Sequence, residues 1–179
     1  MSALLFLIAQ AAAPAPSAAA PPPAPWAVRT RSSNGVESTS VATTAQDGSS
    51  RLVVKCDRAT EALVSVQFFA KQALQLAGDD GSFAAKPVTL RFDNGAANEY
   101  DWQFRSSAAF TSNDAVVTSL TLQLAKAKQV KVETTSAGKF RFEAVFDGPP
   151  SDAPMRQVLQ ACGYVLGQVP VMPAPAPTK

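Results

Sequence analysis

Apolar and polar residues alternate over much of the middle of the chain, and a period of two predicts β-strands. The alternation is clearest in residues 139–146, where Phe140, Phe142, Ala144 and Phe146 are expected to face a hydrophobic core. Charged side chains stand between them and are expected to face solvent. Because successive side chains of a strand point to opposite faces, this segment predicts a strand with one buried face.

Seven other segments are rich in β-branched and aromatic residues and are separated by turn-forming residues. Asn34-Gly35 predicts a type I′ hairpin turn, in which both central residues need positive φ. Asp93-Asn94-Gly95 predicts a second tight turn. Together with the segment above, the expected strands are residues 26–32, 36–44, 51–57, 61–69, 88–92, 100–105, 129–134 and 139–146.

Two segments change to the spacing of a helix. The first is expected over residues 115–126, with Asn113 or Asp114 as its N-cap. Its apolar face would contain Val116, Leu120 and Leu124. The second is expected after Ser151 or Asp152 and would end at Gly163. Its apolar stripe would contain Met155, Val158, Leu159 and Cys162.

The order of these elements predicts an α+β domain that is mainly β. We expect an antiparallel β-sandwich or a strongly bent sheet with two helices. The C-terminal helix is expected to pack on the sheet. The roughly 140 residues between the Pro-rich ends are enough for one domain with a core, so a single domain is expected over residues 26–167. No internal repeat of solenoid length is present.

The first residues differ in composition from this domain. Residues 3–9 form an apolar run that is too short to span a bilayer and is followed by alanines, which is typical of a signal peptide. No Lys or Arg precedes Arg29, so the usual positive start is missing, and an Ala/Pro-rich disordered tail is the alternative. We expect a signal peptide over residues 1–20, an Ala/Pro linker over 21–25 and a Pro/Ala-rich disordered tail over 168–179.

Composition excludes several kinds of chemistry. The 179 residues include no His, which excludes a Ser-His-Asp triad, a Cys-His dyad and a His-ligated metal. With 16 Lys and Arg against 14 Asp and Glu, the net charge of +2 gives no strong field for nucleic acid. We therefore expect no cofactor, no metal, no nucleic-acid partner and no catalytic residues.

Cys56 and Cys162 are the only two cysteines, 106 positions apart. In an exported chain an even count predicts a disulfide, which would join the last helix to the third strand. Closing so long a loop contributes about 4–5 kcal/mol in the chain-entropy model. The alternative is a pair of free buried thiols in a cytosolic protein.

The order of several short motifs resembles a family of exported bacterial proteins. These motifs are Cys56 on a strand, the turn Arg91-Phe92-Asp93-x-Gly95, Trp102, the strand end Phe146-Asp147 and a final helix with Cys162. The family comprises the VasI/TagO-type accessory proteins of type VI secretion and their uncharacterised envelope relatives. The resemblance covers about residues 52–164 and leaves out the N-terminal hairpin and both tails. It implies an exported accessory or binding protein, offers no catalytic residues and supports the pairing of the two cysteines.

Arg91, Asp93 and Trp102 are the candidate interaction residues. An exposed Arg beside an aromatic side chain binds carboxylates or peptides well. The structural alternative is favoured: Asp93 would accept hydrogen bonds in its turn, Arg91 would pair with Asp93 or Asp101, and Trp102 would belong to the core.

Three other features are weaker candidates. Asp79-Asp80 with Glu61 or Asp57 would suggest a carboxylate acid/base site or a Ca²⁺ loop, but a solvated loop is the simpler reading. A local basic cluster would contain Lys126, Lys128 and Lys131, with Lys55 and Lys71. Residues 136–140 resemble the Ser-x-Gly loop of small periplasmic lysozyme inhibitors.

The sequence thus predicts a periplasmic or secreted protein that is not an enzyme. It would bind a protein or peptidoglycan in the cell envelope, as an accessory to type VI secretion or otherwise, and would have no membrane span after signal cleavage. Two alternatives remain: an inhibitor of a lysozyme-type hydrolase, and a hydrolase without His that uses Asp79, Asp80 and Asp93 or a Ser-Lys pair. The sequence does not indicate an oligomeric state.

Overall fold

The computed structural model describes residues 24–78 and 81–170. Within these residues nine strands form one antiparallel sheet in the order β1-β2-β3-β4-β7-β6-β5-β8-β9. The strands are β1 (Arg29–Ser33), β2 (Val36–Thr44), β3 (Ser50–Arg58), β4 (Ala62–Ala70), β5 (Lys86–Phe92), β6 (Ala97–Arg105), β7 (Ala108–Thr111), β8 (Gln129–Thr135) and β9 (Arg141–Asp147). The helices are α1 (Asp114–Leu124) and α2 (Ala153–Ala161).

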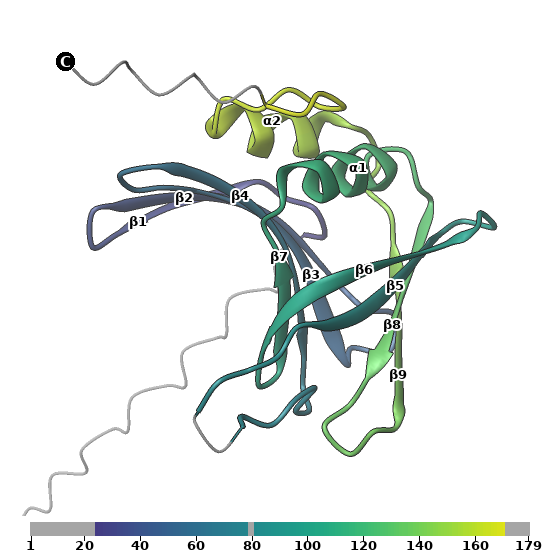
Figure 1. The fold of residues 1–179 in the computed structure, drawn as a ribbon. Coiled ribbons are helices and arrows are strands. Elements are labelled where there is room, and N and C mark those ends of the chain that lie inside the picture. The colour runs from purple at the N-terminus through teal and green to yellow at the C-terminus, as the bar shows by residue number, and fades with distance from the viewer. Residues whose placement is uncertain (1–23, 79–80, 171–179) are drawn as a thin grey trace, which may run out of the picture.

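The sheet bends strongly, so that its two halves face each other (Figure 1). Strand β6 takes part in both halves, because its first part pairs with β5 and its last part with β7. The ring of Phe68 on β4 packs edge-on against Phe142 and Phe146 on β9, with centroids 5.6 and 6.1 Å apart. The predicted fold class, a mainly β domain with a sandwich or strongly bent sheet, is confirmed.

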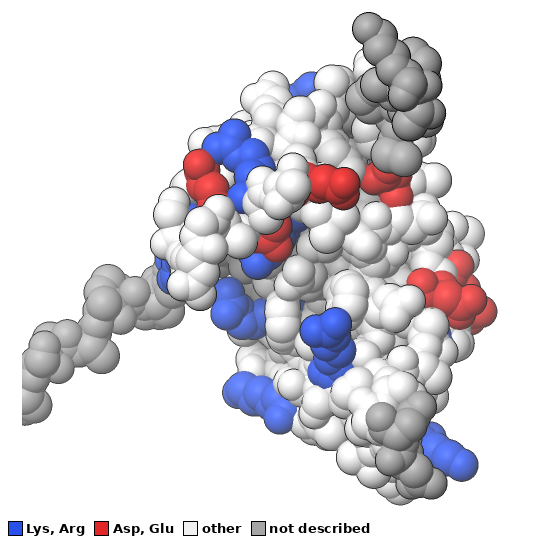
Figure 2. Space-filling view, turned by 60° about the vertical axis from the view of Figure 1, so that its left-hand side comes forward, with Lys and Arg blue, Asp and Glu red and all other residues white. Residues whose placement is uncertain are grey.

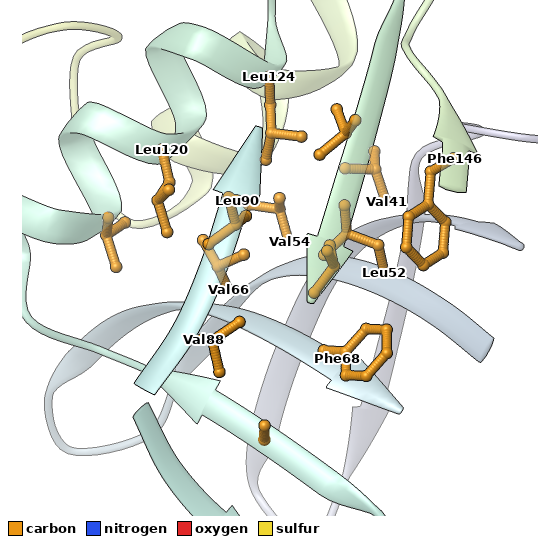
Figure 3. Close-up of a cluster of buried hydrophobic side chains, with 14 of the residues drawn as sticks. Val41, Leu52, Val54, Val66, Phe68, Val88, Leu90, Leu120, Leu124 and Phe146 are labelled. Atoms are coloured by element: carbon orange, nitrogen blue, oxygen red, sulfur yellow. The ribbon is translucent and has the colours of Figure 1, made fainter. Parts of the chain in front are cut away.

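A continuous hydrophobic core fills the space between the two halves and beneath the helices (Figure 3). The predicted alternation accounts for it: Leu52, Val54 and Cys56 of β3 are fully buried, as are Val88 and Leu90 of β5. Each such side chain contributes about 1.5–3 kcal/mol through removal of apolar surface from water. The inner faces of the strands therefore supply most of the stabilising contacts.

Both predicted helices are present. Asn113 caps α1, since its side chain accepts a hydrogen bond from the Val116 N–H at 3.1 Å. Helix α1 ends at Leu124, two residues earlier than predicted. Helix α2 packs against β2 and β3, as predicted for the C-terminal helix, and Gly163 follows it with φ of 76°.

Three local predictions were wrong. Phe140 is 76% exposed, because β9 begins only at Arg141 and the preceding Lys139 has φ of 63°. Strand β7 was missed, because its four residues are too few to show a period. The first strand begins at Arg29 rather than Trp26, which lies in a turn with φ of 60°.

Trp26 has a different role from the one expected of a strand residue. Its side chain is only 3% exposed, and its indole N–H donates to the carbonyl oxygen of Asp147 at 2.9 Å. Nearby, the N–H of Gln46 donates to the carbonyl oxygen of Val145 at 2.8 Å. These contacts link the β2 side of the sheet to the outer edge of β9, so the bent sheet is nearly closed there.

Gly148 lies in close contact with neighbouring backbone. A Cβ at this position would lie 1.8 Å from the carbonyl oxygen of Ala127, and the Gly148 N–H donates to the Lys128 carbonyl oxygen at 2.8 Å. Because backbone rather than a flexible side chain occupies the space, Gly148→Ala is expected to lower the free energy of unfolding by at least about 3 kcal/mol.

Chemical denaturation measures this change, and Gly163→Ala is the matched control. Gly163 has positive φ but open space around it, so only backbone strain of about 1 kcal/mol is expected there. Equal losses for the two variants would contradict the close contact at Gly148.

Candidate functional site

The outer face of β1–β4 is hollowed into an open depression of about 1150 Å³. It lies on the side of these strands opposite the core. Most of its lining therefore consists of the strand residues that alternate with the buried ones. The lining includes Arg29 and Arg31 from β1, Ser38, Ser40 and Ala42 from β2, Arg51, Val53, Lys55 and Asp57 from β3, and Leu63, Gln67 and Phe69 from β4. We call this surface the outer hollow.

Strand register explains the shape of the outer hollow. Arg29 lies opposite Ser40, which in turn lies opposite Lys55, so a small residue stands between two long cationic ones. In the next row, Ser38 stands between Arg31 and Asp57. The small side chains of β2 thus form the floor, and the long side chains of β1 and β3 stand on both sides of it.

Some charged side chains in the outer hollow have a partner and others have none in the described chain. Asp57 accepts a hydrogen bond from the Ser38 hydroxyl and forms an ion pair with Lys55, at 2.9 Å between Nζ and Oδ2. Within the described chain, Arg29, Arg31 and Arg51 form no side-chain hydrogen bond or ion pair and are exposed. The charged side chains left to bind a ligand are therefore these three arginines and one carboxylate, that of the exposed Glu61.

Apolar side chains border the outer hollow on β4. Leu63 is 48% exposed and Phe69 is 38% exposed. A smaller recess next to Phe69 is lined by Arg105 and Phe110, with the guanidinium carbon 5.8 Å from the ring centroid. Arginines beside exposed aromatic side chains are the composition enriched at protein–protein interfaces.

Figure 2 brings the β1–β2 side of the molecule forward. Lys and Arg atoms predominate in the lower left part of this view, whereas Asp and Glu atoms gather above it and at the right-hand side. The charge of this side is thus distributed unevenly although the net charge of the whole chain is only +2.

The turn predicted at Asp93 is present and is held by its own carboxylate. Asp93 Oδ1 accepts the backbone N–H groups of Lys128 and Gln129, both at 2.9 Å, and Asp93 has φ of 50°. Arg91 is exposed and donates to the carbonyl oxygen of Gly95 at 3.2 Å, rather than to either Asp considered from the sequence. Asp93 therefore joins the β5–β6 turn to the start of β8.

Trp102 is separated from these two residues by its position in the core. Its side chain is 0% exposed, and its indole nitrogen has no hydrogen-bond partner among the described residues. Arg91 and Asp93 lie at the surface, so the structure does not bring the three candidates together on one face.

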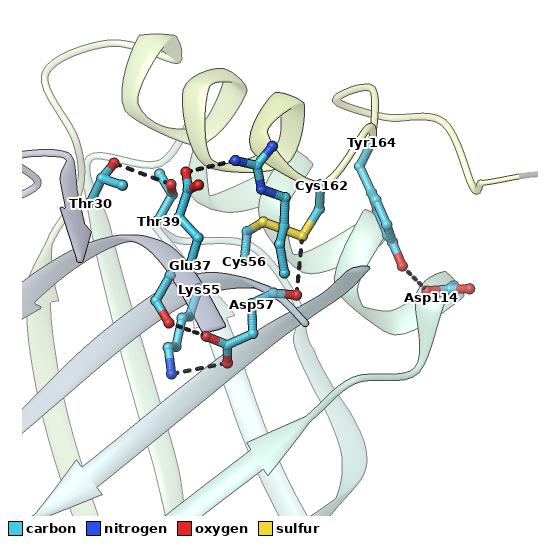
Figure 4. The surroundings of a disulfide bond; sticks show 11 residues. Thr30, Glu37, Thr39, Lys55, Cys56, Asp57, Asp114, Cys162 and Tyr164 are labelled. Carbon is cyan, nitrogen blue, oxygen red and sulfur yellow. Dashed lines mark hydrogen bonds and ion pairs between the residues drawn. A yellow bond between two sulfur atoms is a disulfide. The ribbon is translucent and has the colours of Figure 1, made fainter. Parts of the chain in front are cut away.

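Cys56 and Cys162 form a disulfide with 5.8 Å between their Cα atoms (Figure 4). Close by, the Tyr164 hydroxyl donates to Asp114 Oδ1 at 2.7 Å, which links the chain after α2 to the start of α1. Burial, and then the Asp114 carboxylate, raise the pKa of Tyr164 to about 12. The cross-linked helix is thus also attached to α1 by a polar contact.

The structure does not support the basic cluster or a metal site among the described residues. Lys131 forms ion pairs with Glu133 and Glu143 at 3.0 and 2.8 Å, and hydrogen bonds to these carboxylates raise its pKa. The pair Asp79-Asp80 lies outside the described residues. Among the residues that are described, no group of three His, Cys, Asp or Glu side chains is placed to hold a metal ion.

Lys86 is a cation that the sequence did not single out. Its ammonium donates to the carbonyl oxygens of Leu74 and Thr135 and lies 4.5 Å from the centroid of the Phe104 ring. Partial burial lowers the pKa of Lys86. Through these contacts Lys86 links the segment before β5 to the end of β8, so its role is structural.

The loop at residues 136–140 projects from the β8–β9 hairpin (Figure 1). The Phe140 N–H donates to Ser136 Oγ at 3.3 Å, and a Cβ at Gly138 would lie 3.0 Å from the Phe140 ring. The ring therefore lies close to the Gly138 backbone while most of its surface faces solvent.

Sequence reasoning missed the outer hollow, although one signal was present. Arg29 and Arg31 alternate with Thr30 and Ser32, which places both arginines on one face of a strand. Without the strand register, however, the sequence does not show which residues of β2 and β3 lie beside these two arginines.

Comparison of the chain with protein-family models, curated proteins and solved structures gave no match. The resemblance to the VasI/TagO-type proteins therefore stays a prediction. No helix in the described part of the chain combines the length and apolar character needed to cross a membrane.

Substitution of Asp93 tests the assigned role of this residue. Asp93→Ala removes two hydrogen bonds to backbone N–H groups and is expected to lower the free energy of unfolding by about 1–2 kcal/mol. Asp93→Asn keeps an accepting oxygen and tolerates positive φ, so it should retain most of that stability. Chemical denaturation compares the variants, and equal losses for Ala and Asn would contradict this role.

Proposed function

We propose that the chain is an exported, non-catalytic protein of the cell envelope that acts by binding a protein or cell-wall partner. The observation that supports this most is the outer hollow, where Arg29, Arg31 and Arg51 have no side-chain partner among the described residues and lie near exposed apolar side chains. Arginine and aromatic side chains are enriched at protein–protein interfaces, which favours a binding role for this surface.

The compartment is argued from two features. A disulfide persists in an oxidising space, which favours the periplasm or the exterior over the cytosol. The apolar run at residues 3–9 is typical of a signal peptide. The resemblance to VasI/TagO-type proteins extends the proposal to an accessory role in type VI secretion.

A binding role also agrees with the state of the carboxylates. Asp57 is engaged by Lys55 and Ser38, and Asp93 is engaged by two backbone N–H groups. Neither is placed as a free general acid or base beside a second carboxylate. These two carboxylates thus have partners within the fold, which agrees with recognition as the proposed activity.

Export is tested with residues 1–25 fused to an alkaline phosphatase that lacks its own signal and is active only where its disulfides form. We expect an active reporter in a bacterial host. Replacing Leu5 and Leu7 by Arg breaks the apolar run and should abolish the activity. An inactive fusion, or full activity of the doubly charged variant, would contradict export through this segment.

A second candidate function is inhibition of a hydrolase through residues 136–140. The specific observation in its favour is Phe140, which is 76% exposed in the loop of a projecting hairpin, directly before β9. Exposed aromatic side chains on a projecting loop are well suited to enter a cleft.

A lysozyme assay with the chain in large molar excess tests this candidate. Inhibition is expected to depend on the loop, so Phe140→Ser should relieve it while the exposed Leu76→Ser does not. Unchanged lysozyme activity in the presence of the parent chain would remove this second candidate.

A further inference from the structure

Strand β1 forms one edge of the sheet, and none of the residues that the structure describes covers it. Within the described chain it pairs only with β2, and all five residues of Arg29–Ser33 are exposed. At the other end of the sheet, Gln46 and Trp26 donate hydrogen bonds to the carbonyl oxygens of Val145 and Asp147, at the end of the outer edge of β9. Because alternate residues of an edge strand direct N–H and C=O groups away from the sheet, a further strand can pair with β1.

The same strand also forms one side of the outer hollow. Arg29 and Arg31 line it, whereas Thr30 points to the other face, where its hydroxyl oxygen lies 3.2 Å from that of Thr39. A strand added to β1 would place alternate side chains about 5 Å from Arg29 and Arg31, on the hollow side. Backbone pairing and side-chain recognition would therefore act together.

The charge of β1 indicates which kind of strand could pair with its free edge. A second copy of β1 would bring arginines against arginines, and like charges placed opposite each other destabilise strand pairing. Carboxylates at alternate positions would instead accept paired hydrogen bonds from the guanidinium groups. The chain's own tails do not supply them, because residues 1–23 and 171–179 contain no Asp or Glu.

The small β2 side chains on the floor of the outer hollow leave room for such carboxylates. Ser38 and Ser40 are the β2 neighbours of Arg31 and Arg29, so neither arginine is crowded on that side. Beyond them, Lys55 is already paired with Asp57. The two β1 arginines are thus the exposed cations nearest to an added strand.

We infer that the edge of β1 and the outer hollow bind an extended acidic segment of a partner polypeptide. The segment adds to the sheet as a further strand and directs carboxylates at alternate positions toward Arg29 and Arg31. This inference rests on the proposed binding function and specifies the chemistry of the partner.

The probe is a labelled synthetic peptide in which Glu alternates with Val, and fluorescence anisotropy with the purified, cross-linked chain measures its affinity. A peptide of equal composition with its glutamates in one block carries the same charge but no alternation. We expect the alternating peptide to bind at least about tenfold more tightly. Methylation of its alternate backbone nitrogens should remove this advantage in one of the two registers, since a paired strand needs those N–H groups.

The double substitution Arg29→Thr and Arg31→Thr keeps a strand-forming residue at both positions and should weaken binding at least about tenfold. The matched control is Lys126→Thr with Lys128→Thr, which removes the same charge from two exposed residues after α1. This control should bind as the parent does. Unchanged thermal midpoints would show that all three chains are equally folded.

Three results would overturn the inference: equal affinity for both peptides, equal weakening by the two double variants, or equally tight binding of the anionic polysaccharide polygalacturonate. Each would mean that charge alone, and not an added strand, determines binding. An exported chain that binds neither peptide would remove this inference and leave the proposed function standing. A chain that binds the alternating peptide but gives an inactive export reporter would remove the proposed compartment instead.

Discussion

The disulfide between Cys56 and Cys162 is the constraint on which the arrangement of the molecule depends. It fixes α2 to the inner face of β3, and in the chain-entropy model a loop of 106 residues makes it worth about 4–5 kcal/mol. That is comparable with the net stability of a small domain. The neighbours of Cys56 on the same strand, Lys55 and Asp57, point to the opposite face and line the outer hollow. One strand therefore carries the cross-link on one side and the candidate binding surface on the other.

The two faces of β1–β4 differ in what determines their side chains. On the inner face, Leu52, Val54 and Phe68 are fully buried, and volume and shape determine which side chains fit. On the outer face, Ser38 and Ser40 of β2 lie between two arginines of β1 that have no partner in the described chain and the ion-paired Lys55 and Asp57 of β3, so charge and open space determine this surface. A face of this kind contributes little to folding, and it is the surface to which the proposed binding function is assigned. The outer edge of β1, which no other described residue covers, lies beside it, so the inferred added strand would combine backbone pairing with side-chain recognition.

Much of the fold was predictable because its strands are half-buried and its turns use residues with special backbone geometry. Asn34 and Gly35 have the positive φ values that a type I′ turn requires, and Asn113 caps α1 as expected. Phe140 was placed wrongly because alternation shows which side a residue takes but not where a strand begins. The outer hollow was missed for a related reason: Arg29 and Arg51 are apart in sequence and line one surface only through the register of β1, β2 and β3. Asp93 was recognised as a turn residue, but its partners on the distant Lys128 and Gln129 were not predictable from the turn.

The central claim is that the chain leaves the cytosol and carries one internal cross-link. Intact-mass analysis of protein isolated from its native cells in the presence of a thiol-alkylating reagent, without reduction, tests both parts at once. The account predicts a mass that lacks the first residues of the chain and carries no alkyl group on Cys56 or Cys162. A mass that retains Met1 and carries two alkyl groups would contradict it.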